Sequence, residues 1–337
     1  MNVVVIGAGR MGQRHASGAL MVNAVQKLII TDINESALDT AKNNLNSNAF
    51  AKKINYYLNN DFYNAKLNAD VVIMASTAAN RIEECKKIMQ LNPKAILLEK
   101  PLGQSMAEVE DLIRFFENHK IKTFVNLNTR LYPSFIKLKN DIKSLPQFNG
   151  FADVAISTGT IGIGANGIHY IDLMRFLFDA DTIEFVAGEI DEQIIPSGRG
   201  PQFCDFGGWC VLNYKAGNKV KARVHFSLGS HSTSLGTMNF TFPHARVIID
   251  EFEQKRYNKY RKSGSEMPVQ RYAADYQAQE EEIFTSPDLK ELTALWLQNL
   301  SEGKIVLPDI NESIESHKVM YTWLSKSKTH KDIFPIT

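Results

Sequence analysis

Short apolar runs alternate with segments of helical periodicity over the first third of the chain. The runs lie directly before Gly7 and at residues 28–32, 54–57, 70–76, 95–100 and 122–128. Between them, apolar residues recur at helical spacing, as Ile82, Cys85 and Met89 do. Strands that alternate with helices form a parallel sheet, so the pattern predicts a doubly wound α/β domain over residues 1–125.

A different pattern begins beyond Arg130, where glycine-punctuated segments rich in β-branched and aromatic residues follow one another. These segments lie at residues 150–157, 184–190, 209–217, 219–229, 237–242 and 245–250. They favour a large open sheet that is mixed or antiparallel. Helices are expected over 167–178, from Ser286 to Gly303 and from Asp309 to Lys326. We therefore predict a second α/β domain over residues 126–337.

The balance of charges narrows the possible partners. The chain has 38 Lys and Arg against 37 Asp and Glu, a formal net charge of +1, which gives no reason to expect a nucleic-acid partner. No apolar run approaches the roughly 18 residues of a membrane span, and the chain starts in a strand without a signal region. The three cysteines lack C-x-x-C spacing. We therefore expect a cytoplasmic protein with no membrane partner and no metal.

The first apolar run leads into glycines spaced as G-x-G-x-x-G at the start of a helical pattern. In such a unit the first glycine permits the turn, the second lets the backbone approach a pyrophosphate, and the third allows close helix–strand packing. The helix N-terminus then faces the anion. The candidate cofactor-binding residues here are Gly7, Gly9, Arg10, Met11 and Gly12.

Asp32 ends the next apolar run, 20 residues after Gly12. An acid at this place typically bonds the adenosine ribose hydroxyls. It would also repel the 2′-phosphate of NADP, so we expect NAD as the cofactor, with NADP disfavoured. The alternative is that Asp32 only caps the following helix, a role that Asn34 could fill equally well.

The carboxyl ends of the other strands add further candidates to the same crevice, because ligands of open parallel sheets bind beyond those ends. Ser76, Thr77, Glu99 and Lys100 are expected beside the cofactor, and Asn128 beside the substrate. Lys100 is a credible acid or base, since its ammonium can bond the hydroxyl that is oxidised. The alternative is a solvated lysine, but Pro101 favours a fixed turn, for which a cis bond is one means.

A second constellation lies on the helix expected over 167–178. His169 and Asp172 are three residues apart and share a face, so the carboxylate could orient the imidazole as an acid–base pair requires. A lone histidine in an apolar helix is more often structural. Here Asn166 and Gly167 indicate that the helix N-terminus points into a cleft, and we take His169 and Asp172 as catalytic candidates.

Four segments together resemble the glucose-fructose oxidoreductase and inositol dehydrogenase (Gfo/Idh/MocA) family of NAD(P)-dependent sugar and polyol oxidoreductases. They are GAGRMGQRH (7–15), EKPL (99–102), NTRLYP (128–133) and GIHYIDLMRFL (167–177). The C-terminal segment 303–320 is also similar to the family's. The resemblance implies a Rossmann domain followed by a substrate-binding α/β domain with a large open sheet that commonly mediates dimer or tetramer contacts.

The resemblance also implies roles for single residues. Lys100 matches the family's catalytic lysine, His169 the histidine near the reacting carbon, and Asp172 the acid one turn beyond it. Asn128 and Arg130 fall in the segment beside the substrate. The expected activity is hydride transfer between nicotinamide and a secondary hydroxyl of a sugar, sugar acid or nucleotide-activated sugar.

Two departures from the family pattern leave alternatives open. Ala165 stands where the family usually has an aspartate, four residues before the histidine. Three alternatives follow: Lys100 and His169 suffice for catalysis, Asn166 orients the substrate by hydrogen bonds, or the chemistry has diverged from ordinary alcohol oxidation. Residues 77–81 replace the usual Thr-Pro start and downstream histidine of a loop near the cofactor. The rival functions are a redox-neutral enzyme with recycled NAD, of epimerase or glycosidase type, and a non-enzymatic NAD-dependent sensor.

Overall fold

The computed structural model describes residues 1–46, 53–65, 67–159, 161–229, 236–261, 280–330 and 332–337. The chain folds as two compact units. The first consists of Met1–Asn128 with Pro287–Ile314 and Thr337, and the second of Thr129–Ser286 with Glu315–Ile336. The sequence pattern assigns every residue after 125 to a second domain, whereas Pro287–Ile314 packs with the first unit.

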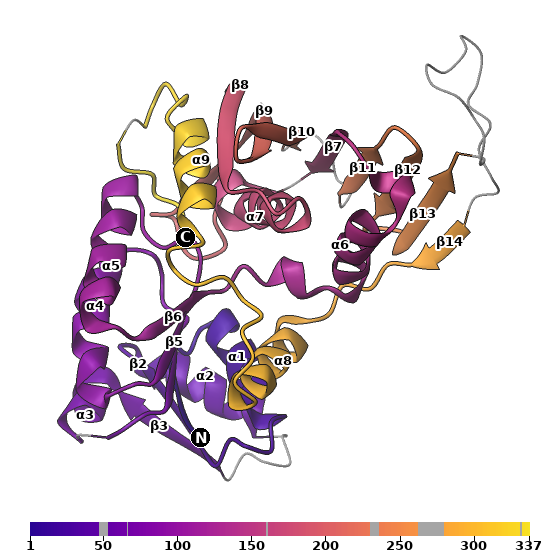
Figure 1. Ribbon diagram of the computed structural model, residues 1–337. Coiled ribbons are helices and arrows are strands. Elements are labelled where there is room, and N and C mark those ends of the chain that lie inside the picture. Colours follow the sequence, from indigo (N-terminus) through magenta and orange to yellow (C-terminus); the bar gives the residue numbers. More distant parts are fainter. Residues whose placement is uncertain (47–52, 66, 160, 230–235, 262–279, 331) are drawn as a thin grey trace. The chain divides into compact units, whose positions relative to one another are not determined.

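The first unit contains a six-stranded sheet in which all neighbouring strands run parallel (Figure 1). Its strands are β1 (Asn2–Ile6), β2 (Lys27–Asp32), β3 (Ile54–Leu58), β4 (Val71–Met74), β5 (Ala95–Leu98) and β6 (Lys122–Val125). Their order is β3-β2-β1-β4-β5-β6, which confirms the predicted Rossmann doubly wound sheet. The chain changes direction across the sheet between β1 and β4, and ligands of such sheets bind at that switch point.

Helices connect these strands as the alternation predicts. They are α1 (Arg10–Leu20), α2 (Glu35–Leu45), α3 (Asn59–Asn64), α4 (Arg81–Ile88) and α5 (Met106–His119). Ser105 caps α5 by accepting a hydrogen bond from the backbone N–H of Glu108. Every residue of β4 and β5 is buried, which is the burial expected of strands covered by helices on both faces.

Helix α8 (Leu289–Ser301) joins the first unit because it packs closely on α1. Gly18 makes this possible, since a Cβ there would lie 2.3 Å from the backbone oxygen of Lys290. The helix begins later than predicted: Asp288 is the N-cap residue and forms a capping box with Glu291. The helix start expected at Ser286 is therefore wrong, because the Asp288 carboxylate satisfies the N-terminal N–H groups.

The second unit contains a mixed sheet of eight strands, as the glycine-punctuated segments predict. Its strands are β7 (Ala152–Gly159), β8 (Thr182–Pro196), β9 (Cys204–Ala216), β10 (Lys219–Gly229), β11 (Thr237–Thr241), β12 (Ala245–Asp250), β13 (Lys255–Tyr260) and β14 (Glu280–Ile283). The order is β14-β13-β12-β11-β7-β10-β9-β8, with β7 and β10 parallel and the other neighbours antiparallel. Along β7 buried and exposed residues alternate, so one face of the sheet carries the core.

The helices of the second unit include one that the sequence analysis missed. They are α6 (Pro133–Ser144), α7 (Ile168–Leu177), preceded by the π-helical turn η5 (Ile163–Gly167), and α9 (Ile314–Leu324). Helix α6 was missed although Pro133 occupies a favoured first position. Helix α9 begins later than Asp309, because the preceding residues form turns. Among the described residues, every helix is too short or too polar to cross a lipid bilayer.

Candidate active site

The glycine loop after β1 has the geometry that a dinucleotide pyrophosphate requires. Gly7 has a φ of +100°, and a Cβ on Gly12 would lie only 1.8 Å from the backbone oxygen of Gly7. A Cβ on Gly9, in contrast, would meet no atom within 4 Å. Gly9 therefore borders open space at the start of α1, which is where the backbone must let phosphates approach.

The N-terminus of α1 is suited to an anion. Its N-cap residue is Gly9, which has no side chain to satisfy the first N–H groups, and its first turn contains no acidic residue. Arg10 and Met11 lie in this turn. The helix dipole and the exposed N–H groups favour negative charge here. The residues present thus fit the pyrophosphate of a dinucleotide.

Asp32 lies at the end of β2, against the glycine loop. Its Oδ2 accepts a hydrogen bond of 2.6 Å from the N–H of Ala8, and its Oδ1 accepts one of 2.9 Å from the N–H of Asn34. The side chain of Asn34 caps α2 by bonding the N–H of Ser36. The capping role considered for Asp32 thus belongs to Asn34, and ribose binding by Asp32 stays a prediction.

Ser76 and Thr77 follow β4, and both are partly exposed. The hydroxyl of Ser76 donates to Glu84 Oε2 at 2.5 Å. An acidic side chain from the first turn of α4 (Arg81–Ile88) therefore contacts one of the predicted cofactor-binding residues. Whether either residue binds the cofactor stays a prediction.

Lys100 follows β5 and is partly exposed, and its bond to Pro101 is cis. The preceding Glu99 is buried, with 2% of its surface exposed. Its carboxylate receives a hydrogen bond of 2.7 Å from the side-chain amide of Asn126. Glu99 thus supports the turn from within the core, and its predicted contact with the cofactor stays a prediction.

His15, on α1, is fully buried and also contacts Glu99. Its Nε2 lies 2.8 Å from Glu99 Oε1, and its Nδ1 lies 2.8 Å from Thr293 Oγ1 on α8. The Thr293 hydroxyl donates to the carbonyl oxygen of Leu289, so it accepts from the Nδ1–H of His15. Nε2 then faces the Glu99 carboxylate. His15 ends the motif GAGRMGQRH, and its sequence pattern predicts no role for it.

Arg81 is a second residue that the sequence analysis missed. It begins α4 and is 2% exposed. Its guanidinium donates to the backbone oxygens of Glu99 and Pro101, the two residues that flank Lys100. The only sequence signal was its place in the loop at 77–81, which departs from the family pattern.

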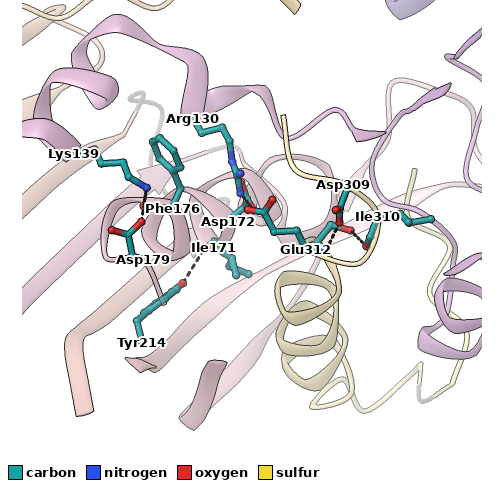
Figure 2. Close-up of polar contacts among 11 residues, drawn as sticks. Arg130, Lys139, Ile171, Asp172, Phe176, Asp179, Tyr214, Asp309, Ile310 and Glu312 are labelled. Atoms are coloured by element: carbon teal, nitrogen blue, oxygen red, sulfur yellow. Dashed lines mark hydrogen bonds and ion pairs between the residues drawn. The ribbon is translucent and has the colours of Figure 1, made fainter. Parts of the chain in front are cut away.

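In the second unit, Arg130 and Asp172 form a buried bidentate ion pair (Figure 2). Nε of Arg130 donates to Asp172 Oδ2 at 2.9 Å, and Nη2 donates to Oδ1 at 2.7 Å. The guanidinium also lies 5.1 Å from the ring centroid of Phe176. Both carboxylate oxygens of Asp172 thus bind Arg130, and the orientation of His169 by Asp172 stays a prediction.

His169 and Asn166 lie at the start of α7. Asn166 is exposed in η5, and His169 is partly exposed in the first turn of the helix. Asn128, from the first unit, is partly exposed after β6. These exposures leave all three side chains able to meet a ligand, and their predicted contacts with substrate stay predictions.

Asp205, from β9, fixes the turn that contains Ala165. Its carboxylate accepts hydrogen bonds of 2.9 Å from the N–H of Gly164 and 2.6 Å from that of Ala165. It occupies the space beside Gly162, where a Cβ would lie 2.1 Å from Asp205 Cγ. A carboxylate thus lies at the backbone of position 165, but it is engaged in shaping η5.

These features define a dinucleotide-binding protein of the Rossmann class. Residues 1–127 match the family described as "Oxidoreductase family, NAD-binding Rossmann fold" (GFO_IDH_MocA). Over these residues the match agrees with the resemblance of the motifs and confirms the expectation of an NAD-binding Rossmann fold. Within the described ranges, no group of three or more His, Cys, Asp and Glu side chains is arranged to hold a metal ion.

The chain is similar to several characterised proteins and solved structures. It is 24% identical over 220 residues to myo-inositol 2-dehydrogenase of Thermotoga maritima, an alignment that covers 59% of this chain and 58% of that protein. The chain thus spans under two thirds of the length of this curated relative.

Two solved structures share the fold over nearly the whole chain. An oxidoreductase from Agrobacterium radiobacter, in complex with NAD⁺, L-tartaric acid and magnesium, has a TM-score of 0.73 at 11% identity, covering 97% of this chain and 96% of that one. UDP-N-acetylglucosamine 3-dehydrogenase of Acidithiobacillus ferrooxidans has a TM-score of 0.69 at 16% identity, covering 98% of each chain. At these identities the likeness shows the fold alone.

Proposed function

We propose that this protein is an NAD-dependent oxidoreductase that transfers hydride between nicotinamide and a secondary hydroxyl of a sugar, sugar acid or nucleotide-activated sugar. The observation that carries the proposal is the position of Lys100. Lys100 directly follows β5, and the glycine loop directly follows β1. Because these parallel strands belong to one sheet, both lie at its carboxyl edge. In sheets of this kind, catalytic groups and cofactor meet at that edge.

Different residues of the chain would bind the cofactor and transfer the proton. Gly9 and the first turn of α1 would hold the pyrophosphate, and Asp32 the adenosine ribose. When bound, NAD supplies the nicotinamide carbon that accepts or returns the hydride. Lys100 bonds the substrate hydroxyl and takes its proton during oxidation, or returns it during reduction. His169 is the second candidate acid or base.

The other predicted residues would bind and orient the substrate. Asn128 and Asn166 carry amides that can both donate to and accept from sugar hydroxyls. Arg130 would bind the substrate with an orientation fixed by Asp172, since the ion pair and the contact with Phe176 hold its guanidinium in one place. In this assignment Asp172 positions Arg130, while the catalytic role suggested by the resemblance is left to Lys100 and His169.

The substrate class is supported by what related proteins act on. The curated relative is a dehydrogenase of a cyclic polyol, and one protein of the same fold is a dehydrogenase of a nucleotide-linked amino sugar. Both names describe oxidation at a carbon that carries a hydroxyl. We further propose that NAD is preferred to NADP, that the protein acts in the cytoplasm, and that it forms a homodimer or homotetramer.

The test is the rise of NADH absorbance with excess NAD and a panel of polyols, sugars, sugar acids and nucleotide sugars. A rise with one class of compound identifies a dehydrogenase and its substrate. If every compound leaves the absorbance unchanged although NAD binds, the dehydrogenase proposal is wrong.

Ala165 in place of the usual aspartate gives weight to two rival functions, a redox-neutral enzyme with recycled NAD and a non-enzymatic NAD-dependent sensor. A redox-neutral enzyme would retain NAD through purification and convert substrate without net NADH release. A sensor would bind one protein partner in a fixed stoichiometry, and that complex would dissociate with NAD. Product analysis and pull-down in the presence and absence of NAD separate the two.

A further inference from the structure

Arg81 contacts the backbone at the end of two neighbouring strands. Its Nη1 donates to the carbonyl oxygen of Glu99 and, at 2.6 Å, to that of Pro101. Its Nη2 donates to the carbonyl oxygen of Ser76 at 3.0 Å. One guanidinium therefore joins the loop after β4 to the turn after β5.

The two contacts on the second turn lie on either side of Lys100. The carbonyl oxygen of Glu99 belongs to the peptide group directly before Lys100, and that of Pro101 to the peptide group after Pro101, so the backbone is held on both sides of Lys100. A guanidinium suits this task because its N–H donors have a fixed planar geometry, whereas an ammonium presents a single point of charge. The backbone direction at Lys100 thus depends on Arg81.

The same turn is held from its other side by side-chain contacts. The Glu99 carboxylate is bonded by His15 at 2.8 Å and by Asn126 at 2.7 Å. Glu99 and Arg81 are each only 2% exposed, so these bonds are made in the core, where they resist exchange with water. Lys100 is partly exposed and is therefore the residue of this turn that can meet a ligand.

We propose that Arg81 is a positioning residue that fixes the direction of Lys100 and holds a positive charge behind its backbone. This inference rests on the proposed function, in which Lys100 moves the substrate proton. Two effects follow. The side chain starts from a fixed point, which proton transfer requires. The neighbouring cation also disfavours the ammonium form of Lys100, so more of its amine is neutral and reactive.

A purely structural role for Arg81 makes a different prediction. If the guanidinium only supported the fold, its removal would lower stability, but the folded fraction would keep the reactivity of Lys100 and the turnover number. The experiment therefore needs readouts that are measured on folded protein and report on Lys100 itself.

The experiment compares Arg81→Met and Arg81→Lys with wild type and with two controls, Lys100→Met and Arg114→Met. Arg114 is a suitable control because it is an exposed arginine on α5 of the same unit, paired with Asp111. The first readout is the rate at which acetic anhydride modifies Lys100 in the NAD-saturated protein, followed by mass spectrometry. The second is kcat, KM and the NAD dissociation constant with the compound found by the substrate panel.

For Arg81→Met we expect Lys100 to be acetylated at least about threefold more slowly than in wild type, because the loss of a nearby cation favours the ammonium form. We expect kcat to fall about 10- to 100-fold, with KM and the NAD dissociation constant within about threefold, because misplacement of a catalytic group acts on the chemical step. Arg81→Lys keeps the charge and should restore the acetylation rate but only part of kcat. Arg114→Met should match wild type.

The inference is overturned if two results occur together while Lys100→Met is inactive. In folded Arg81→Met, acetic anhydride modifies Lys100 at the wild-type rate, and the kcat of this variant equals that of wild type. If Arg81→Met does not fold, Arg81→Lys decides: wild-type kcat in that variant overturns the positioning role. Full turnover by Lys100→Met would instead refute the proposed function. Because acetylation needs no substrate, it tests the effect of Arg81 on Lys100 even when no compound of the panel is active.

Discussion

His15 on α1 and Glu99 after β5 lie 2.8 Å apart and join the helix of the glycine loop to the turn that carries Lys100. Both side chains are buried, and His15 also bonds Thr293 on α8. A pair of this kind is specific because each partner needs the other to satisfy its polar atoms in the core. The pyrophosphate loop and the candidate catalytic lysine are therefore built on one connected set of residues.

This pair predicts the effect of Glu99→Gln. The amide keeps the size of the side chain but is a weaker acceptor than a carboxylate, so the hydrogen bonds of His15 and Asn126 to this side chain should weaken. We expect the free energy of unfolding to fall by about 1–3 kcal/mol. Urea unfolding measures this, and Glu110→Gln on the exposed side of α5 should be neutral. Equal stability of Glu99→Gln and wild type would contradict the account.

The Arg130–Asp172 pair predicts strong coupling within the second unit. Asp172→Asn or Arg130→Met alone leaves a buried charge without its partner, which should cost about 3–5 kcal/mol of stability. The double variant removes both charges, so its loss should be smaller than the sum of the two single losses by at least about 1 kcal/mol. Strictly additive losses in denaturant titrations would show that the pair does not act as a unit.

The sequence predicts the fold of the first unit well because its signals are local. Each strand is a short apolar run, and the spacing of Gly7, Gly9 and Gly12 matches the backbone that the structure adopts. The packing of α8 on α1 could not be predicted, because it depends on the absence of a Cβ at Gly18, a residue more than 250 positions away along the chain. Contacts between distant segments leave no periodic trace in either one.

The carboxylate of Asp32 should determine the preference for NAD over NADP. Asp32→Ala removes the carboxylate that would bond the ribose and repel a 2′-phosphate, so NAD should bind about tenfold more weakly, roughly 1.4 kcal/mol, and the preference over NADP should narrow. Fluorescence titration with both cofactors measures this. Asn34→Ala, which removes only the cap of α2, should leave selectivity unchanged. An unaltered ratio of the two affinities in Asp32→Ala would remove the residue from cofactor choice.

Glu251 predicts how stability depends on pH in the second unit. Burial raises the pKa of this carboxyl, which accepts a hydrogen bond of 2.7 Å from the Tyr170 hydroxyl. A carboxyl whose folded pKa lies above its unfolded pKa stabilises the fold fully below the unfolded pKa. That stabilisation is lost as the pH rises through the folded pKa.

The free energy of unfolding of wild type should therefore decrease as the pH rises above the ordinary glutamate range. Glu251→Gln, which has no proton to lose, should show a flatter profile. Urea unfolding across this range is the measurement, with Glu253→Gln, an exposed neighbour, as the control. Parallel profiles for wild type and Glu251→Gln would exclude a raised pKa at this site.

The candidate site was predicted in part, and the reason for each gap is physical. Lys100 and Asp32 end strands, so a strand prediction already places them at the ligand-binding edge. The partner of Asp172 could not be read from helical spacing, because spacing brings His169 near it but gives no sign of Arg130, which is 42 residues away along the chain. Arg81 and Asp205 act through backbone groups, and such contacts have no sequence pattern.

The central claim is that Lys100 moves the proton of the substrate hydroxyl while the glycine loop binds NAD independently of it. The most direct test is to measure turnover and the NAD dissociation constant for wild type and Lys100→Ala side by side. The account predicts that turnover is abolished and that NAD affinity stays within about tenfold, or roughly 1.4 kcal/mol. Wild-type turnover in Lys100→Ala would contradict it.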